Sequence, residues 1–227
     1  YTTGIFGKWH LDGPDGAKPG EQGFDTVHQS YHTWSDAKIS DPENPKGVFS
    51  LTRGAGEFMV KNRDRPFFVY LSHYAIHSEL QARPATLARF QAKAPGARHN
   101  DALYAACLYD LDASVGLLLK KIAELGLEKN TLVVFTSDNG GTQKSSQEPL
   151  RGNKGCYYDG GVREPFLVRW PGVTRPGSTC DVPVISVDLF PTFLAAAGAP
   201  VPAGKMLDGE SLVPLLRGGN RLQRPAI

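Results

Sequence analysis

Several short segments of the 227-residue sequence carry residue types that could bind an anion or a metal ion. The segment GKWH (7–10) places the ammonium of Lys8 and the imidazole of His10 two residues apart, at the end of an expected strand. Residues i and i+2 of extended backbone point to the same side, so both could face one anion. His77 follows a second hydrophobic strand. Taken alone, each of these groups has a simpler interpretation, as a surface lysine or as a histidine bonded to a backbone carbonyl.

Two further segments add oxygen ligands and another cation. TSDNGG (136–141) places Asp138 and Asn139 directly after a buried strand. Both offer oxygen, the ligand type that Ca²⁺ and Mg²⁺ prefer, although an ordinary Asp-Asn-Gly turn contains the same residues. In the glycine-rich segment LRGNKG (150–155), Lys154 could reach an oxyanion, or the segment could be a solvated loop. Each segment alone therefore leaves the function open.

Hydrophobic patterns predict the elements that position these segments. Apolar runs rich in aromatic and β-branched residues predict strands at 3–9, 66–73, 131–137 and 166–170. Apolar residues at spacings of three and four predict a long helix over 101–125, capped by Asn100 and ended by Gly126. Shorter helices are expected at 51–63 and 186–197.

Strands that alternate with helices predict an α/β fold, with a mostly parallel sheet and helices on both faces. The last three of the four strands should belong to one sheet, with the long helix packed on a face. In such sheets ligands bind beyond the carboxyl ends of the strands, where His77 and Asp138 fall. Residues 12–47, rich in Gly, Pro, Asp and Lys, are expected to form a long loop excursion.

Composition narrows the classes of partner. A net charge of +2 is too weak to predict binding to nucleic acid or to an anionic membrane. No apolar run approaches the length of a bilayer-spanning helix, so no membrane association is expected. Cys107, Cys156 and Cys180 lie far apart without CxxC spacing, which argues against zinc or a disulfide framework. Because the net charge is small, any anion binding must come from a local cluster of cations.

Taken together and in order, the motifs resemble those of the sulfatase family. The resemblance covers nearly the whole chain and is weakest at 12–47 and 81–100. The matching segments are GKWHL (7–11), FFVYLSHYAIHSEL (67–80), FTSDNGG (135–141), LRGNKGCYYDGGVREPFLVRWPG (150–172), SVDLFPTFLAAAGAP (186–200) and LDGESLVPLLRG (207–218). This resemblance implies an alkaline-phosphatase-like α/β fold and a sulfuric ester hydrolase of the arylsulfatase type.

The resemblance also implies roles for the cationic and imidazole groups. Sulfatases use a formylglycine nucleophile, and Lys8 and His10 look like the pair that contacts its hydrate. His77 and Lys154 look like the groups that contact the sulfate and the leaving oxygen, one of them acting as the acid. All four are expected to be catalytic, and Lys8, His77 and Lys154 are also expected to bind the substrate.

The metal and the substrate class follow from the same resemblance. Asp138 and Asn139 look like ligands of a divalent cation, usually Ca²⁺ with Mg²⁺ possible. The implied substrate is a sulfated small molecule or a sulfated carbohydrate. Family members are commonly periplasmic, extracellular or lysosomal, and the resemblance alone suggests one of these compartments.

One family signature is absent from the sequence. Formylglycine forms from the first residue of a C-x-P-x-R or S-x-P-x-R motif, and no such motif occurs in residues 1–227. We therefore expect these residues to be the central part of a sulfatase catalytic domain, with the nucleophile and two metal-binding aspartates encoded upstream. The alternatives are a phosphonate monoester or phosphodiester hydrolase of the same superfamily, or a non-catalytic remnant that binds a sulfated ligand.

Overall fold

The computed structural model divides into two compact units. It describes residues 1–11, 16–29 and 41–224. The first unit comprises residues 1–128 and 137–164, and the second comprises residues 129–136 and 165–227. The candidate site residues predicted from the sequence therefore all belong to the first unit.

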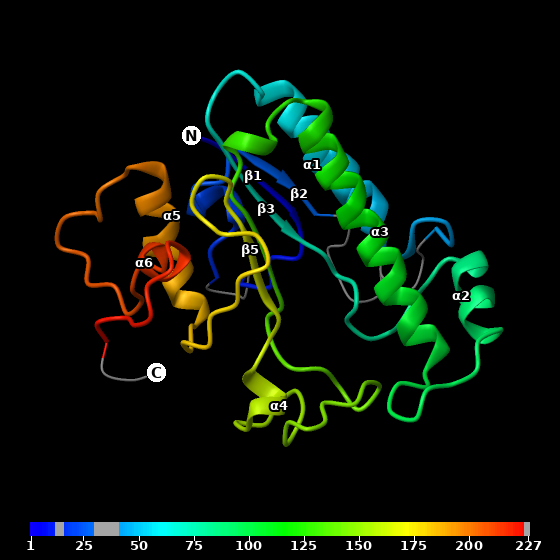
Figure 1. Cartoon of the computed structure of the whole chain (residues 1–227). Coiled ribbons are helices and arrows are strands. Elements are labelled where there is room, and N and C mark those ends of the chain that lie inside the picture. Colours follow the sequence, from blue (N-terminus) through cyan, green and yellow to red (C-terminus); the bar gives the residue numbers. More distant parts are fainter. Residues whose placement is uncertain (12–15, 30–40, 225–227) are drawn as a thin grey trace. The chain divides into compact units, whose positions relative to one another are not determined.

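A three-stranded parallel sheet, in the order β2-β1-β3, forms the base of the first unit (Figure 1). Its strands are β1 (Thr2–Gly7), β2 (Thr26–His28) and β3 (Phe67–Ser72). Gly7, the last residue of β1, pairs with Ser72, the last residue of β3. The segments that leave these two strands therefore start side by side at the same edge of the sheet.

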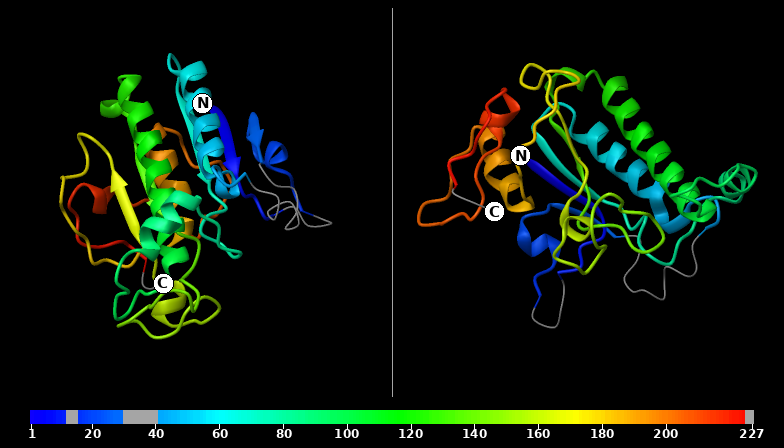
Figure 2. Two further views of the ribbon diagram at one scale, coloured as in Figure 1. Left: turned by 90° about the vertical axis from the view of Figure 1, so that its right-hand side faces the viewer. Right: turned by 60° about the horizontal axis from the view of Figure 1, so that its bottom comes forward.

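Helices of the first unit pack on this sheet and on one another (Figures 1 and 2). They are α1 (Val48–Asn62), α2 (Pro84–Gln91) and α3 (Ala102–Glu124), and the unit also contains the short α4 (Asp159–Val162). The described residues of this unit also form the 3-10 turns η1 (Pro19–Gln22) and η3 (Pro45–Gly47), and η4 (Glu128–Asn130) begins at its last residue before the second unit. α1 packs against β1 and β3, α3 runs along α1, and α2 packs against α3.

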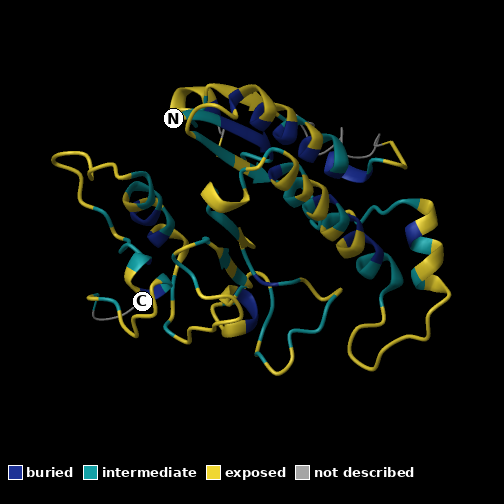
Figure 3. Ribbon diagram, turned by 45° about the horizontal axis from the view of Figure 1, so that its top comes forward, coloured by how far each residue is buried: buried dark blue, intermediate teal, exposed yellow. Residues whose placement is uncertain are grey.

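The core of the first unit lies between α1 and the sheet. Phe6 of β1 packs edge-on against Phe58 of α1, with ring centroids 5.8 Å apart. Leu51 and Ala55 of α1 complete the buried cluster, and alternate residues of β3 pack against it. Each buried Phe or Leu stabilises the fold by about 1.5–3 kcal/mol, so this cluster fixes α1 on the strands that lead to the candidate site. Figure 3 shows the buried inner face of α1 and its exposed outer face.

α3 meets α1 through a face that includes polar residues. Its buried side chains are Ala106, Cys107, Asp110, Ser114 and Ile122. This face only partly coincides with the apolar stripe expected from the sequence, because Asp110 and Ser114 are buried with their hydrogen-bonding partners. The helix is capped by Asp101, whose carboxylate accepts from the N–H of Tyr104 at 2.9 Å, rather than by Asn100.

By length and composition alone, α3 is apolar enough to cross a membrane, contrary to the expectation that no such run exists. It nevertheless packs against both α1 and α2. Its Asp110 accepts hydrogen bonds from the N–H and Nε of Arg83, at 2.8 and 2.9 Å, and from Oγ1 of Thr86 at 2.8 Å. In this structure α3 is therefore a packed helix of the first unit, tied to α2 by a buried carboxylate.

The expected loop excursion at 12–47 contains regular structure in the part that is described. β2 pairs in parallel with β1, so this segment supplies a strand to the sheet. Three short elements, η1, β2 and η3, interrupt the loop. Residues 12–15 and 30–40 of the expected excursion lie outside the described residues.

The second unit contains a two-stranded antiparallel sheet. Its strands are β4 (Val133–Thr136) and β5 (Phe166–Arg169). The expectation that the last three strands share one sheet is therefore wrong, because β3 pairs with β1 and β4 pairs with β5. An apolar run identifies a strand but not the direction or the partner of its pairing. The remaining elements are η5 (Ser186–Asp188), α5 (Leu189–Ala197) and α6 (Val213–Leu216).

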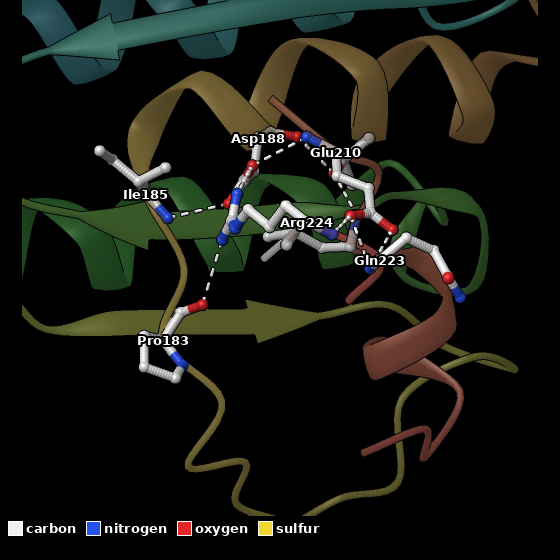
Figure 4. A network of polar contacts seen from close by, with 8 residues as sticks. Pro183, Ile185, Asp188, Glu210, Gln223 and Arg224 are labelled. Atoms are coloured by element: carbon white, nitrogen blue, oxygen red, sulfur yellow. Dashed lines mark hydrogen bonds and ion pairs between the residues drawn. The ribbon is translucent and has the colours of Figure 1, made fainter. Parts of the chain in front are cut away.

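A buried carboxylate organises the second unit (Figure 4). Asp188 accepts hydrogen bonds from the N–H groups of Ile185 and Glu210, each at 2.9 Å, and pairs with the guanidinium of Arg224. Arg224 also donates to the carbonyl of Pro183 at 3.1 Å. Burial by itself raises the pKa of Asp188, but the donors outweigh it, so the net pKa lies below the ordinary value. The network ties residues 210 and 224 to the start of α5.

Candidate functional site

Lys8 is held at the edge of the sheet by the end of β3. Its N–H donates to the carbonyl of Ser72 at 2.7 Å, and Oγ of Ser72 donates back to the carbonyl of Lys8 at 2.6 Å. The preceding Gly7 has φ of 116°, and a Cβ at that position would collide with the Ser72 carbonyl. Glycine is therefore needed for the close approach that places Lys8 beside the segment leading to His77.

His10 lies beyond this turn, and its backbone is left-handed with φ of 58°. β1 ends at Gly7 and the backbone is left-handed at His10, so strand alternation does not set the relative directions of the Lys8 and His10 side chains. Trp9 anchors the turn, since its Nε1–H donates to the carbonyl of Ala17 at 2.8 Å. His10 is exposed, and the turn rather than a strand sets its direction.

His77 lies in the loop that follows β3. Its N–H donates to the carbonyl of Tyr74 at 2.9 Å, and its Nδ1 lies 2.7 Å from the carbonyl of Ser78. Because a carbonyl can only accept, this contact requires Nδ1 to carry a proton. In the neutral imidazole, Nε2 then has a lone pair that can accept a proton.

Three lysines surround His77 and affect its ionisation. Burial lowers the pKa of His77, the bond to Ser78 opposes that effect, and the positive charges of Lys8, Lys154 and Lys46 lower the pKa further. The structure therefore brings Lys8 and Lys154 into the electrostatic neighbourhood of His77, from segments separated by up to 146 positions (154 − 8) in the sequence. Such a concentration of positive charge favours a bound anion.

Lys46 is the member of this group that sequence reasoning missed. Only 2% of its surface is exposed, and its Nζ donates to the backbone carbonyl of His77 at 2.7 Å. It belongs to η3, inside the segment interpreted as a loop excursion. Nothing in the sequence distinguishes it from a surface lysine, because its burial depends on the fold around α1.

The segments that carry Asp138 and Lys154 interlock through their backbones. The N–H of Lys154 donates to the carbonyl of Gly141, and the N–H of Gly140 donates to the carbonyl of Gly161, each at 2.9 Å. A Cβ on Gly140 would collide with the carbonyl of Gly160. The glycines of both segments thus allow two chain stretches to approach closely, which fixes Lys154 next to the Asp138-Asn139 turn.

Asp138 is exposed, and its negative charge affects the pKa values of Tyr70 in β3 and of Glu164 after α4. Burial, followed by the negative charge of Asp138, raises the pKa of Tyr70. Burial also raises the pKa of Glu164, with a contribution from Asp138, although a hydrogen bond with Ser137 opposes it. Asp138 therefore lies near β3, the strand that leads to His77.

The donor chemistry at 138–139 fits a hard divalent cation. The Nδ2 of Asn139 donates to the carbonyl of Gly140 at 3.1 Å, which directs this amide nitrogen to the backbone and leaves Oδ1 as the potential ligand. Carboxylate and carboxamide oxygens suit Ca²⁺ or Mg²⁺. Within the described residues no group of three or more His, Cys, Asp or Glu side chains could hold a metal ion. Asp138 and Asn139 could therefore supply only part of a coordination sphere of about 6–8 oxygens.

The arrangement as a whole combines three kinds of group within the first unit. Lys8 and Lys154 can neutralise an oxyanion, and His77 can exchange a proton at Nε2. Asp138 and Asn139 can hold part of a metal. Groups of these kinds support the cleavage of an anionic ester, in which negative charge develops on the leaving oxygen.

Comparisons with known proteins give the family. The sulfatase family profile matches residues 1–199. Rat (Rattus norvegicus) steryl-sulfatase is 37% identical over 188 residues, which cover 78% of this chain and 31% of that protein. Human (Homo sapiens) arylsulfatase A is 32% identical over 275 aligned positions, covering 100% of this chain and 51% of that protein. The chain thus spans from about a third to about half of the length of these relatives.

Solved structures show the same fold. The crystal structure of Ps i-CgsB in complex with k-i-k-neocarrahexaose has a TM-score of 0.81 and 32% identity, covering 97% of this chain and 56% of that one. The phosphonate monoester hydrolase of Agrobacterium radiobacter has a TM-score of 0.73 at 18% identity, covering 98% and 60% of the two chains, and so shares the fold. Because the family profile covers most of its length, this chain belongs to the sulfatase family.

Proposed function

We propose that this chain is the central part of a sulfatase catalytic domain that hydrolyses sulfate esters with a formylglycine nucleophile and a divalent cation. The observation that carries the proposal is the environment of His77, which lies among Lys8, Lys46 and Lys154. An imidazole that can exchange a proton, close to several lysines, suits the hydrolysis of a sulfate ester, because both the ester and the released sulfate are anions. Membership of the sulfatase family and the oxygen donors at 138–139 support the same assignment.

In this proposal Lys8 and Lys154 bind the sulfate group and His77 serves as the acid. Burial, and after it the positive charges of the lysines, lower the pKa of His77 in the free protein, so its imidazole is neutral near pH 7. A bound sulfate ester brings negative charge, which offsets these lysines and raises the proton affinity of Nε2. His77 can then hold a proton and donate it to the leaving oxygen. His10, on the turn after β1, assists turnover at the nucleophile.

Asp138 and Asn139 would hold the cation through their side-chain oxygens, with Ca²⁺ as the expected metal and Mg²⁺ as the alternative. A divalent cation and a formylglycine hydrate together supply charge stabilisation and a nucleophile. The nucleophile and the other metal ligands come, in this proposal, from sequence upstream of residue 1. An in-frame C-x-P-x-R or S-x-P-x-R motif in the upstream DNA would support it, and a gene encoding residues 1–227 alone would favour a non-catalytic protein that binds a sulfated ligand.

A sulfated carbohydrate is the substrate class that the relatives favour. The structure at 32% identity holds a neocarrahexaose. A second solved structure, with 20% identity and a TM-score of 0.71, was obtained in complex with its substrate D-glucosamine-2-N,6-O-disulfate. A sulfated small molecule is the alternative class, since steryl-sulfatase and arylsulfatase A are also relatives.

The test is hydrolysis of a sulfated chromogenic phenol and of sulfated oligosaccharides by the full protein encoded by the gene. Lys154→Ala should lower kcat by about 100- to 1,000-fold, because one group that stabilises the oxyanion is lost. Lys144→Ala is the matched control, since Lys144 is exposed in a neighbouring loop and pairs with Asp101 at 3.6 Å. Equal activity of both variants would reject the assignment of Lys154.

A phosphonate monoester or phosphodiester hydrolase is the second candidate, because the phosphonate monoester hydrolase shares this fold. Assays on phosphonate and phosphodiester substrates, run in parallel with the sulfate esters, separate the two functions. Higher kcat/KM on a phosphonate ester than on every sulfate ester would replace the proposed function with this one.

A further inference from the structure

Lys46 is a buried cation that contributes to the field around His77 but to which the proposal above assigns no contact with the substrate. It is 2% exposed, and its backbone is left-handed with φ of 51°. Burying an ammonium without a counter-charge is unfavourable, so a buried lysine needs compensating partners. Burial lowers the pKa of Lys46, and the nearby Lys8 lowers it further, while Cys107 and Glu79 oppose the shift.

The position of Lys46 is fixed by the start of α1. Asn44 Oδ1 accepts from the N–H groups of Phe49 and Ser50, at 3.0 and 3.1 Å. Nδ2 of Asn44 donates to Oγ of Ser50 at 2.9 Å. This capping arrangement closes the η3 turn onto the helix, so the backbone of Lys46 has little freedom. The helix is in turn held by the Phe6–Phe58 core.

From this fixed base, Lys46 reaches the loop that carries His77. Its Nζ donates to the carbonyl of His77 at 2.7 Å, across 31 positions of sequence. The same peptide segment orients the imidazole, because Nδ1 of His77 donates to the carbonyl of the next residue, Ser78. A buried charged donor on a backbone carbonyl forms a stronger hydrogen bond than a neutral one.

We propose that Lys46 is a positioning residue, which anchors the carbonyl of His77 and thereby sets the direction of the His77 imidazole at the sulfate site. The proposal rests on the proposed function for its catalytic consequence, but the contact and the charge can be tested without any substrate. Lys46 acts through His77 and is not assigned a contact with the substrate.

Two consequences distinguish this role from simple structural support. The first is electrostatic, because Lys46 is one of three lysines that lower the pKa of His77. Among the described residues, Lys8, Lys154, Glu79 and Cys107 also influence the ionisation of His77 or of Lys46. Removing the charge of Lys46 should therefore raise the pKa of His77. The second is geometric. Without the Lys46 contact the His77 imidazole should be misdirected, which should lower kcat by a larger factor than it changes KM.

The experiment measures the His77 titration by NMR in the full protein labelled at histidine, without substrate, and kcat and KM on a sulfated chromogenic phenol. Lys46→Met should raise the His77 pKa and lower kcat by about 100-fold, with a much smaller change in KM. Lys46→Arg keeps the charge and the donor. It should leave the His77 pKa as in the wild type and keep kcat within about 3-fold of the wild-type value. Lys61→Met, at an exposed lysine in the last turn of α1, is the matched control and should change neither.

The outcomes separate this proposal from the proposed function. An unchanged His77 pKa in a folded Lys46→Met protein rejects the positioning role, whatever the activity of the wild type. If Lys46→Met raises the His77 pKa but the wild-type protein has no sulfatase activity, the role of the Lys46 contact is supported and the proposed function is rejected. If Lys46→Met does not fold, Lys46→Gln keeps a donor without the charge and should raise the His77 pKa. Failure of the Met, Gln and Arg variants to fold would assign Lys46 a structural role and overturn the proposal.

Discussion

His73, the residue that follows β3, is partly buried beside α1, where it contacts Thr52. Its Nε2 lies 3.4 Å from Oγ1 of Thr52, and Thr52 in turn lies 2.5 Å from Oγ of Ser114. Its Nδ1 is buried and has no hydrogen-bonding partner within the described part of the chain. Burial lowers the pKa of His73 to about 4, because a charged imidazole would lose its hydration.

The stability of the first unit should therefore fall in acid. An unfolded histidine binds a proton near pH 6.5, whereas His73 in the fold does so only near pH 4. The contribution of His73 to the free energy of unfolding is fully present above pH 6.5. It is lost as the pH falls from 6.5 to about 4, and it does not change further below pH 4. The loss amounts to about 3 kcal/mol.

Chemical denaturation between pH 7 and pH 4 measures this effect. His73→Phe removes the titrating group and should flatten the pH dependence. His99→Asn, at an exposed residue before α3, should leave the dependence as it is in the wild type. A wild-type slope that survives in His73→Phe would show that other groups cause it.

Asp138 has a more specific role in our proposal, as the charged ligand of the cation. In the full protein Asp138→Ala should weaken Ca²⁺ binding and abolish sulfatase activity, because a hard cation loses a charged oxygen. Asp159→Ala is the matched control, since Asp159 is an exposed carboxylate of α4 that pairs with Arg163 at 3.9 Å. Calorimetric titration with Ca²⁺ checks the affinity, and wild-type affinity in Asp138→Ala would remove Asp138 from the metal site.

At the scale of elements, the attachment of α2 to α3 depends on Asp110. Its carboxylate is 1% exposed and receives hydrogen bonds from both Arg83 and Thr86. Asp110→Ala would leave the guanidinium and the hydroxyl without their acceptor, and should lower the free energy of unfolding by about 3–5 kcal/mol.

Urea denaturation of Asp110→Ala and of Asp112→Ala tests this prediction. Asp112 lies on the exposed side of the same helix and should change stability by less than about 0.5 kcal/mol. The double variant Arg83→Met/Asp110→Leu should recover part of the loss, because no charge is left buried without a partner. Equal stability of the two alanine variants would refute the role of Asp110.

The elements that the sequence predicts best are those whose local pattern is sufficient. The run at 66–73 forms β3, and the periodic stretch at 101–125 forms α3, ended by Gly126 in the left-handed conformation. Pairing and burial were less predictable, because they depend on distant contacts. The antiparallel pairing of β4 with β5 and the burial of Lys46 both arise from the packed structure, which a local pattern does not contain.

The candidate site was predictable in composition but not in geometry. The family resemblance predicted Lys8, His77 and Lys154 as site residues, which remains a proposal, and the fold brings these three residues into one electrostatic neighbourhood. The relation of His10 to Lys8 was predicted from strand alternation, whereas the left-handed backbone at His10 ends that alternation. Motifs thus define which groups are present, and turns with positive φ decide where they point.

At the scale of the whole molecule, the chain leaves the first unit at residue 129 and returns to it at residue 137. The candidate residues nevertheless all fall in the first unit, so one compact body holds the lysines, His77 and the oxygen donors. Among its described residues we propose two oxygen ligands, Asp138 and Asn139, for a cation that binds about 6–8 oxygens, and residues 1–227 contain no formylglycine motif. The catalytic proposal therefore requires a nucleophile and further metal ligands from outside residues 1–227.

We accordingly expect that residues 1–227 alone do not turn over a sulfate ester. Water attacks an anionic sulfate slowly, and the proposed mechanism avoids this with a covalent step that needs the formylglycine hydrate. The test is to express these residues alone, verify folding by circular dichroism, add Ca²⁺ and measure phenol release from a sulfated chromogenic phenol beside the full protein. Metal-dependent turnover that Lys154→Ala abolishes would show that the chain carries its own nucleophile, and would overturn the proposal that this group lies upstream.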